Sequence, residues 1–274
     1  MSTVIKLSSP ATREFWEIPV LYEDEHLLAL DKPAGLLVSA ELLEPERPSL
    51  MGLLHEAIAA GKPWVSSRGL TYLSNAHRLD SDTSGVLLLA KSKTVLAQLS
   101  DLFGNEKPHR QFLALVAGIP AEDQFQVNAK LSPHPVVAGM VRVDARTGKR
   151  AETRFTVIEK FSRHTLIQCE LLTDRPHQAR VHLCNSGLRI VGDALYGGKP
   201  LWLSSLKPDY RLKPGREERA LLSRVTLHSE QLALPHPVSG ETLTLTAPWP
   251  KDLRVAVKYL REYGPARVSP SEQI

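Results

Sequence analysis

The chain has 274 residues, of which 42% are hydrophobic and 23% charged; this composition is ordinary for a globular protein and excludes a disordered or fibrous class. Its net charge of +4 leans towards an anionic partner such as nucleic acid, although many enzymes with neutral substrates are equally basic. The two cysteines, Cys169 and Cys184, are too few for a disulfide framework, and no apolar run has the length of a signal sequence or a membrane helix. We therefore expect a soluble, cytoplasmic protein with no membrane contact.

Short apolar runs and turn residues predict both strands and helices in the first half of the chain. Residues 19–39 predict three strands, separated by an acidic turn and by a Lys-Pro-Ala-Gly turn. Ser49 predicts the start of a helix that Gly61 ends. A strand over 86–90 and a helix over 92–104 follow.

The second half of the chain is richer in strands. We expect strands over 111–118, 153–161, 164–172, 223–234 and 241–248, and helices over 175–187 and 253–263. Strands outnumber helices and do not alternate strictly with them. This order predicts an α+β fold with a mixed, mostly antiparallel β-sheet and flanking helices, rather than a doubly wound parallel sheet.

The stretch HRLDSDTSG, residues 77–85, places an arginine and two carboxylates among small hydroxyl residues, directly before an apolar strand. A distant polar segment, TDRPHQAR, supplies Arg180. An arginine against Asp80 would hold its carboxylate ionised in a dry pocket, where desolvation alone favours the neutral form. Such an aspartate is a competent nucleophile or base. The structural alternative is that residues 80–84 only cap a turn and that Arg180 is a charge on a helix surface.

Several other chemistries fail on spacing. The segment 197–200 (GGKP) has proline where a phosphate loop needs Ser or Thr after its lysine. His177 and His182 are five residues apart, so they do not share one helix face as a zinc pair does. The sequence Asp-Thr-Ser-Gly at 82–85 occurs once, whereas an aspartic protease needs two carboxylates that share a proton.

HRLDSDTSGVLLLAKS closely resembles the active-site motif of the RluA-type pseudouridine synthases. Five further segments resemble other motifs of that family, in the family's order: YEDEHLLALDKPAGLLV, QFLALVAG, GKRAETRF, LLTDRPHQARVHLCNSGLRIVGDALYGG and VTLHSEQLALPHPVSGE. The resemblance implies a pseudouridine synthase domain over residues 18–252. An N-terminal extension of residues 1–17 would precede it, and a C-terminal helix and tail of residues 253–274 would follow.

The resemblance also implies a reaction, the isomerisation of uridine to pseudouridine within RNA. The bond from ribose to N1 breaks and a new bond forms to C5. By position in the motifs, Asp80 is the catalytic aspartate, Arg180 pairs with it, and Arg78 helps to hold the nucleotide flipped out of its helix. RNA or base contacts are implied for further motif residues: Thr83, Ser84, Arg175, His177 and Gln178. No metal and no cofactor is implied, because an isomerisation needs neither redox equivalents nor ATP.

Three positions depart from the family pattern. Phe112 stands where the family has a tyrosine beneath the target base; it keeps the stacking face, worth about 1–3 kcal/mol per base, but lacks the hydroxyl. We count Phe112 among the catalytic residues, with filling of the core as the alternative, and we expect Arg110 to contact RNA in place of the motif lysine. Asp174 replaces a glycine and Ala179 an isoleucine.

Target selection is expected to rest on the synthase domain itself, because residues 1–17 are too few for the small RNA-binding domain that many relatives carry upstream. The basic segments 142–150 and 199–219 are the candidates. The expected partner is ribosomal or transfer RNA, bound by a monomer without a nucleotide cofactor. Two other functions stay open: a catalytically weak RNA-folding protein on the same fold, and a hydrolase that releases free uracil.

Overall fold

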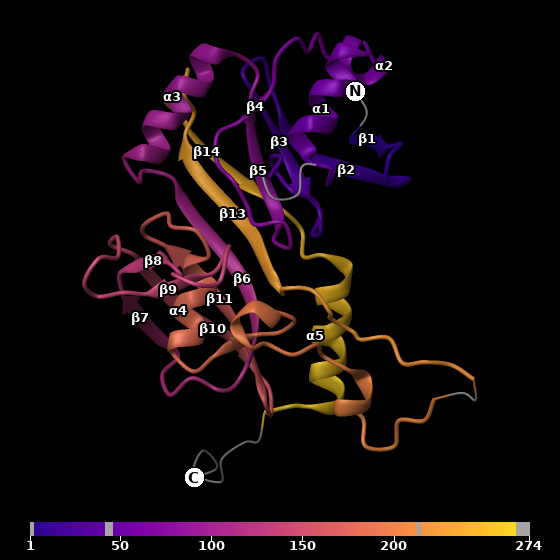
Figure 1. Cartoon of the computed structure of the whole chain (residues 1–274), viewed down its shortest axis with the longest axis vertical. Coiled ribbons are helices and arrows are strands. Elements are labelled where there is room, and N and C mark those ends of the chain that lie inside the picture. The colour runs from indigo at the N-terminus through magenta and orange to yellow at the C-terminus, as the bar shows by residue number, and fades with distance from the viewer. Residues whose placement is uncertain (1–2, 42–45, 213–214, 267–274) are drawn as a thin grey trace. The chain divides into compact units, whose positions relative to one another are not determined.

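The computed structural model of the chain describes residues 3–41, 46–212 and 215–266 (Figure 1). The chain forms two compact units. Unit 1 contains residues up to Arg110 together with Ser229–Pro248, and unit 2 contains Gln111–His228 and the residues from Trp249 onward. Two strands, β6 (His109–Ala117) and β13 (Leu227–Pro235), continue from one unit into the other.

Unit 1 is built on a sheet in the order β1-β2-β3-β5-β13, to which β4 adds beside β5 and β14 beside β13. Its strands are β1 (Val4–Ser9), β2 (Glu14–Glu23), β3 (Leu27–Lys32), β4 (Ser74–Asn75), β5 (Ser84–Ala90), part of β13, and β14 (Thr242–Thr246). Its helices are α1 (Leu50–Ala59), α2 (Pro63–Ser66) and α3 (Lys93–Gly104). All seven residues of β5 are buried, so this strand forms the centre of the unit's core.

Two helices in unit 1 begin where the sequence predicts. Ser49 precedes α1 and accepts the backbone N–H of Gly52, and Ser92 precedes α3 and accepts that of Val95. The predicted strands over 86–90 and the helices over 50–61 and 92–104 are confirmed within a residue or two at each end.

The third strand predicted within residues 19–39 is wrong. Leu36, Leu37 and Val38 are buried, but their backbone does not join the sheet. The carbonyl groups of Leu37 and Val38 instead accept the N–H groups of Leu50 and Met51 at the start of α1. This short apolar segment therefore satisfies a helix terminus, an outcome that apolar content alone does not distinguish from a strand.

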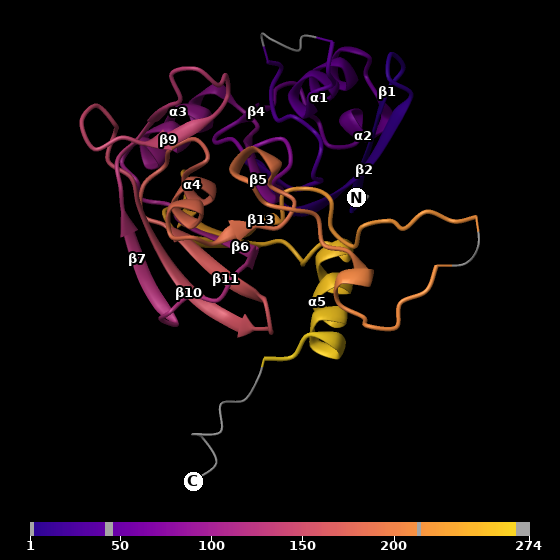
Figure 2. The same ribbon diagram turned by 60° about the horizontal axis from the view of Figure 1, so that its bottom comes forward.

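Unit 2 holds a second set of strands in the order β6-β11-β10-β7, with β12 beside β6, and a separate two-stranded hairpin (Figures 1 and 2). Its strands are β6, β7 (Gln124–Asn128), β8 (Leu131–Pro133), β9 (Val141–Val143), β10 (Glu152–Lys160), β11 (His164–Leu171) and β12 (Arg189–Ile190). Its helical segments are α4 (Gln178–Asn185), η1 (Ala194–Tyr196), η2 (Leu203–Ser205) and α5 (Lys251–Tyr263). Four buried residues of α5 pack on Leu113, Leu115 and Leu166 of β6 and β11.

The predicted fold class is confirmed, because the strand pairs with a defined register are antiparallel and helices flank the strands. The prediction missed β1, β4, β7, β8, β9 and β12. The burial of β7 alternates between exposed and partly buried residues, and β8 and β9 have three residues each, so these strands carry little apolar signal. Among the described residues, no helix is long and apolar enough to cross a membrane.

Candidate active site

Asp80 lies in a tight turn directly before β5. The backbone N–H of Thr83 donates to the carbonyl oxygen of Asp80 at 3.1 Å, which closes the turn, and the Asp80 side chain is half-buried. Arg78, two residues earlier, is exposed. A partly accessible carboxylate, that of Asp80, and an accessible guanidinium, that of Arg78, therefore lie next to the N-terminal end of the buried strand β5.

The side chain of Lys32 anchors the Asp80 turn through buried hydrogen bonds. It is fully buried at the end of β3, and its ammonium group donates to the carbonyl oxygens of Pro33, Leu36 and Ser81 at 2.7–2.8 Å. Gly35 adds a backbone hydrogen bond to the same Ser81 oxygen at 2.9 Å. The Lys-Pro-Ala-Gly turn and the Asp80 turn are thus joined through one buried positive charge. From the sequence, Lys32 was predicted only as part of a turn, although a lysine at the end of a mostly apolar strand was a usable signal.

The backbone conformation and the surroundings of Gly85 explain why the motif has a glycine at this position. Its φ angle is +112°, and a Cβ atom would lie 2.2 Å from the carbonyl oxygen of Ser229 on β13. The glycine therefore admits the neighbouring strand. The hydroxyl residues before it, Thr83 and Ser84, are only 2% and 3% exposed. Their predicted contact with RNA stays a prediction, and in the protein alone both side chains are buried in unit 1.

In unit 2, the segment before α4 is more irregular than predicted. The helix begins at Gln178 instead of residue 175, because His177 adopts a left-handed backbone conformation with φ of 53°. Asp174, which replaces the family's glycine, is not among the described non-glycine residues with positive φ. This departure from the motif therefore introduces no left-handed strain at that residue.

Gln178 is buried in a continuous hydrogen-bond chain. Its amide oxygen accepts the Thr173 hydroxyl, and its amide nitrogen donates to the Glu152 carbonyl and the Thr153 hydroxyl. The Thr153 hydroxyl in turn lies 2.9 Å from Nδ1 of His182, whose Nε2 donates to the Ala129 carbonyl. Burial lowers the pKa of His182, in keeping with a neutral ring in this chain. Gln178 thus fixes the start of α4 to β10, and its direct contact with RNA stays a prediction.

Arg180 is a buried residue, 7% exposed, so the alternative that it is a surface helix charge is wrong. Its Nε and Nη2 atoms donate to the two carboxylate oxygens of Asp193, each at 2.8 Å, and its guanidinium lies over the ring of Tyr196, 5.0 Å from the centroid. Two donors in parallel fix the plane of the guanidinium, and Nη1 lies outside this pair. Asp193 and Tyr196 belong to the Gly-Asp-x-x-Tyr-Gly segment, for which the sequence predicted no role in the site.

Tyr196 also connects His177 with the β8–β9 hairpin. Its hydroxyl accepts the backbone N–H of Val141 at 2.9 Å and lies 2.9 Å from Nδ1 of His177. Arg175, next to this group, is partly buried and donates from Nη1 to the Asp174 carbonyl at 2.7 Å. Three predicted site residues of unit 2, Arg175, His177 and Arg180, therefore lie together around the start of α4.

Two more predicted site residues lie on β6, where Arg110 is 5% exposed and Phe112 is 7% exposed. Arg110 belongs to unit 1 and Phe112 to unit 2. Likewise, Asp80 and Arg180 belong to different units, so the pairing between them stays a prediction.

Comparison with known proteins identifies the family. Residues 26–185 match the model of the RNA pseudouridylate synthase family. This span includes the Asp80 turn and the whole of α4, the two segments from which the site has been built.

The chain belongs to this family.

Curated relatives agree with this assignment. The synthase is 35% identical to ribosomal large subunit pseudouridine synthase D of Xanthomonas campestris, over 96% of this chain and 75% of the relative. It is 34% identical to ribosomal large subunit pseudouridine synthase C of Escherichia coli, over 88% of this chain and 70% of the relative. The structure of human RNA pseudouridylate synthase domain containing 4 aligns with a TM-score of 0.65 at 23% identity, over 88% of this chain and 92% of that one, which supports the fold. The enzyme is an isomerase that converts uridine to pseudouridine, and its substrate is RNA.

The basic segment 199–219 of the synthase is partly anchored to α5. The ammonium of Lys207 lies 5.3 Å from the centroid of the Tyr263 ring, and Arg211 is exposed. Lys213, the third basic residue predicted to bind RNA there, lies outside the described residues. RNA binding by this segment stays a prediction.

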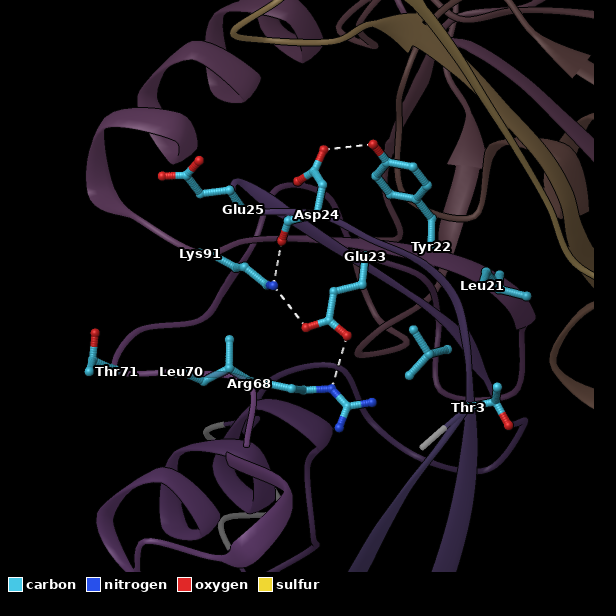
Figure 3. A pocket seen from close by; sticks show the side chains of 12 residues that line it. Thr3, Leu21, Tyr22, Glu23, Asp24, Glu25, Arg68, Leu70, Thr71 and Lys91 are labelled. Carbon is cyan, nitrogen blue, oxygen red and sulfur yellow. Dashed lines mark hydrogen bonds and ion pairs between the residues drawn. The ribbon is translucent and has the colours of Figure 1, made fainter. Parts of the chain in front are cut away.

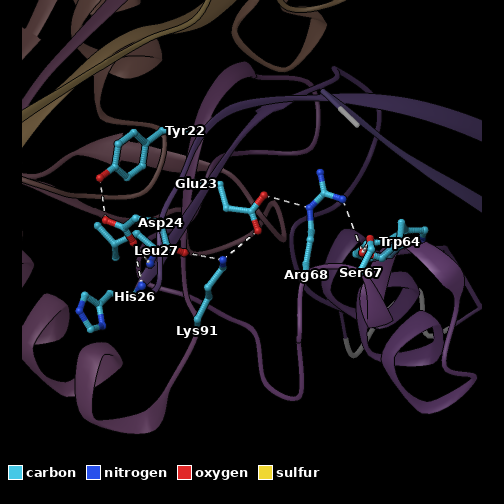
Figure 4. A network of polar contacts seen from close by, with 9 residues as sticks. All are labelled: Tyr22, Glu23, Asp24, His26, Leu27, Trp64, Ser67, Arg68 and Lys91. Atoms are coloured by element: carbon cyan, nitrogen blue, oxygen red, sulfur yellow. Dashed lines mark hydrogen bonds and ion pairs between the residues drawn. The ribbon is translucent and has the colours of Figure 1, made fainter. Parts of the chain in front are cut away.

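A cavity of about 640 Å³ lies at the other end of β5 from Asp80 (Figure 3). Glu23 accepts from Arg68 at 2.9 Å and from Lys91 at 2.8 Å on one side of it, and Lys91 also donates to the Asp24 carbonyl (Figure 4). Seven residues of strand at about 3.3 Å each separate this network from the Asp80 turn, a span of roughly 23 Å. No predicted site residue lines the cavity.

The same network closes the β2–β3 turn. Asp24 accepts from the Tyr22 hydroxyl at 2.6 Å, from the backbone N–H groups of His26 and Leu27, and from His236. Burial alone would raise the pKa of Asp24, but these hydrogen bonds together lower it. The bond to Asp24 raises the pKa of Tyr22 to about 12. The geometry assigns this cluster a structural role, because its charges satisfy one another.

Proposed function

We propose that Asp80 is the catalytic carboxylate of this synthase. The observation that carries the proposal is the anchoring of its turn: the buried ammonium of Lys32 holds the carbonyl of Ser81, directly after Asp80, and the buried strand β5 follows from Ser84, while the Asp80 carboxylate stays half-buried. A fixed, partly accessible carboxylate is suited to act on C1′ of the target ribose or on a ribose proton.

In this proposal the other polar residues position the nucleotide. Arg180 would face Asp80 with the part of its guanidinium that the Asp193 pair leaves outside, and Arg78 would hold the target nucleotide after it leaves the RNA stack. Phe112 would stack on the target base. The isomerisation balances within the substrate, because the hydrogen lost from C5 is matched by a proton gained at N1, so the proposal includes no cofactor.

The names of the relatives favour ribosomal RNA of the large subunit as the target, and transfer RNA is the second candidate. We also propose that the enzyme acts as a monomer in the cytoplasm. Both of its cysteines are free thiols, one buried and one partly buried, which suits a reducing compartment.

The test is tritium release from RNA labelled at C5 of uridine, with extracted ribosomal and transfer RNA as separate substrates. Asp80→Asn is compared with wild type and with Asp82→Asn, which removes the same charge from the same turn two residues away. The reaction replaces the hydrogen at C5 by carbon, so release reports the new bond. Wild type and Asp82→Asn should release tritium and Asp80→Asn should not, while all three bind RNA and unfold at similar temperatures.

Other outcomes separate the alternatives. Release by Asp80→Asn at the wild-type rate would remove Asp80 from the chemistry. Free uracil in the supernatant would indicate glycosidic hydrolysis. RNA binding by wild type without release from either RNA would favour the RNA-folding function.

A further inference from the structure

The loop between β8 and β9 exposes two adjacent apolar side chains. We name residues 134–140 the hairpin tip. Within it, Val136 is 85% exposed and Val137 41% exposed. Exposed single apolar residues are common, but two neighbours at the end of a hairpin form a small apolar surface directed at solvent.

The hairpin tip is an ordered turn. Nδ1 of His134 accepts the backbone N–H groups of Val136 at 3.2 Å and Val137 at 2.9 Å. The backbone closes the loop again between His134 and Met140 and between Met140 and Val137. These bonds hold the two valines in place before any partner binds, which reduces the entropy lost on binding.

The hairpin stands in a strongly basic part of the chain. Residues 130–150 contain five Lys or Arg (130, 142, 146, 149 and 150) and one Asp (144), so their net charge is +4, equal to that of the whole chain. Hydrogen bonds from the Thr147 hydroxyl and from the backbone of Thr147 and Arg146 hold the pKa of Asp144 well below its usual range. That carboxylate shapes the loop after β9. Among the described residues, Lys130, Arg146 and Lys149 form no ion pair.

Charge and apolar surface are close enough to meet one RNA strand. The three residues of β9 separate the hairpin tip from the basic loop that follows it, a distance of about 10 Å at 3.3 Å per residue. The hairpin is also fixed to α4 within unit 2, because Tyr196 accepts the Val141 N–H and contacts both His177 and Arg180. Figure 2 shows β9 beside α4.

We propose that the hairpin tip is an RNA wedge: Val136 and Val137 pack against nucleobases near the target uridine, and Arg146 and Lys149 hold the adjoining phosphates. The proposal rests on the proposed function, since a flipped uridine leaves a gap in the base stack that an apolar side chain can fill. An anionic, base-bearing partner matches both features of this surface. A protein partner would account for the valines but not for the concentration of positive charge beside them.

The test compares three variants in their affinity for extracted large-subunit RNA across a series of salt concentrations. Val136→Ser with Val137→Ser removes the apolar tip, and Arg146→Ala with Lys149→Ala removes two phosphate contacts. The control is Val238→Ser, because Val238 is 53% exposed and its N–H is likewise accepted by a histidine Nδ1, that of His236.

The two double variants should differ in their salt dependence. Loss of the valines should weaken binding by about fivefold to tenfold with an unchanged salt slope, because apolar contacts release no counterions. Loss of the two cations should reduce the slope of log K against log salt by about 1.4, at roughly 0.7 per phosphate contact in a single strand. The control should match wild type in both measurements.

Tritium release is measured on the same proteins. The valine variant should lose about tenfold in kcat/KM with an unchanged melting temperature. Wild-type affinity and wild-type tritium release by that variant would overturn the wedge while the proposed function stands. Absence of release from wild type would instead reject the proposed function, and the binding series would still decide whether the hairpin tip contacts RNA.

Discussion

Replacement of Lys32 by methionine tests whether the buried ammonium holds the catalytic turn. Methionine keeps the unbranched apolar stem of lysine, ends about one atom short of the ammonium nitrogen, and donates no hydrogen bonds. Three carbonyl oxygens, those of Pro33, Leu36 and Ser81, would lose a charged donor. We expect the variant to fold and to be both less stable and less active.

The size of the stability loss follows from burial. The Leu36 bond is fully buried, so its carbonyl would lose about 1–3 kcal/mol as an unsatisfied acceptor; the other two bonds are partly accessible to water and lose less. The sum is about 3 kcal/mol, or a decrease of roughly 6–12 °C in melting temperature for a chain of this size.

The activity loss has a different cause. Ser81 follows Asp80 directly, so release of its carbonyl frees the backbone of the catalytic turn. A displacement of about 1 Å at a catalytic group can cost roughly 100-fold in rate. We therefore expect kcat to fall by at least about tenfold at a temperature where the variant is fully folded, with KM for RNA changed by less than about threefold.

Lys91→Met is the matched control, because Lys91 makes a comparable, partly buried set of bonds, to Glu23 and Asp24, at the opposite end of β5. It should lower the melting temperature but leave kcat within about twofold of wild type. Equal kcat values for Lys32→Met, Lys91→Met and wild type, measured on folded protein by tritium release, would show that the Asp80 turn keeps its geometry without the ammonium.

Three further predictions concern Gly85, Asp31 and Phe112. Gly85→Ala should lower stability by about 2–4 kcal/mol, since the new Cβ would lie 2.2 Å from the Ser229 carbonyl oxygen. The control, Gly61→Ala, lies in open space at φ +57° and should cost about 1 kcal/mol. Urea unfolding of both variants measures the difference. Burial raises the pKa of Asp31 to about 6, so the ionised carboxylate lowers the stability of the protein progressively as pH rises from about 4 through 6. Asp31→Asn should therefore stabilise the protein by about 1 kcal/mol at pH 8, a value reduced for solvent screening at this partly exposed site. At pH 4 the same substitution should change stability by almost nothing. Phe112→Tyr should raise kcat for tritium release by about tenfold or more if a hydroxyl at this position assists proton removal from C5, and an unchanged or lower kcat would assign Phe112 to packing.

Local signals in the sequence predicted most of unit 1. Ser49 and Ser92 each precede an apolar stretch of helical period, and each is observed as the N-cap whose hydroxyl accepts a backbone N–H. The error over Leu37 and Val38 has a clear physical origin. A buried apolar segment bonds its carbonyls to whichever donors lie nearby, and here these donors are the first backbone N–H groups of α1 instead of those of a neighbouring strand.

The sequence predicted which residues belong to the candidate site but not the contacts that each of them makes. The motif comparison pointed to Asp80, Gln178 and Arg180, yet no local pattern shows that Gln178 is committed to Thr153 on β10 and to Thr173 in the bend after β11. The partner of Arg180 was missed for the same reason. Asp193 follows Arg180 by 13 positions, beyond the reach of helical or strand periodicity.

Burial and contacts distinguish the motif residues that stabilise the fold from those that can act on the RNA. His77 accepts the Leu88 N–H and stacks on Phe103, with ring centroids 5.0 Å apart, so it is committed to the fold of unit 1. Arg78, its immediate neighbour in the sequence, is exposed. Replacement of a committed residue lowers stability first and activity as a consequence, whereas replacement of an exposed one can change RNA binding with no change in melting temperature. A pair of measurements, melting temperature and kcat/KM, on His77→Ala and Arg78→Ala therefore tells which side chains of one continuous motif build the turn and which act on the RNA.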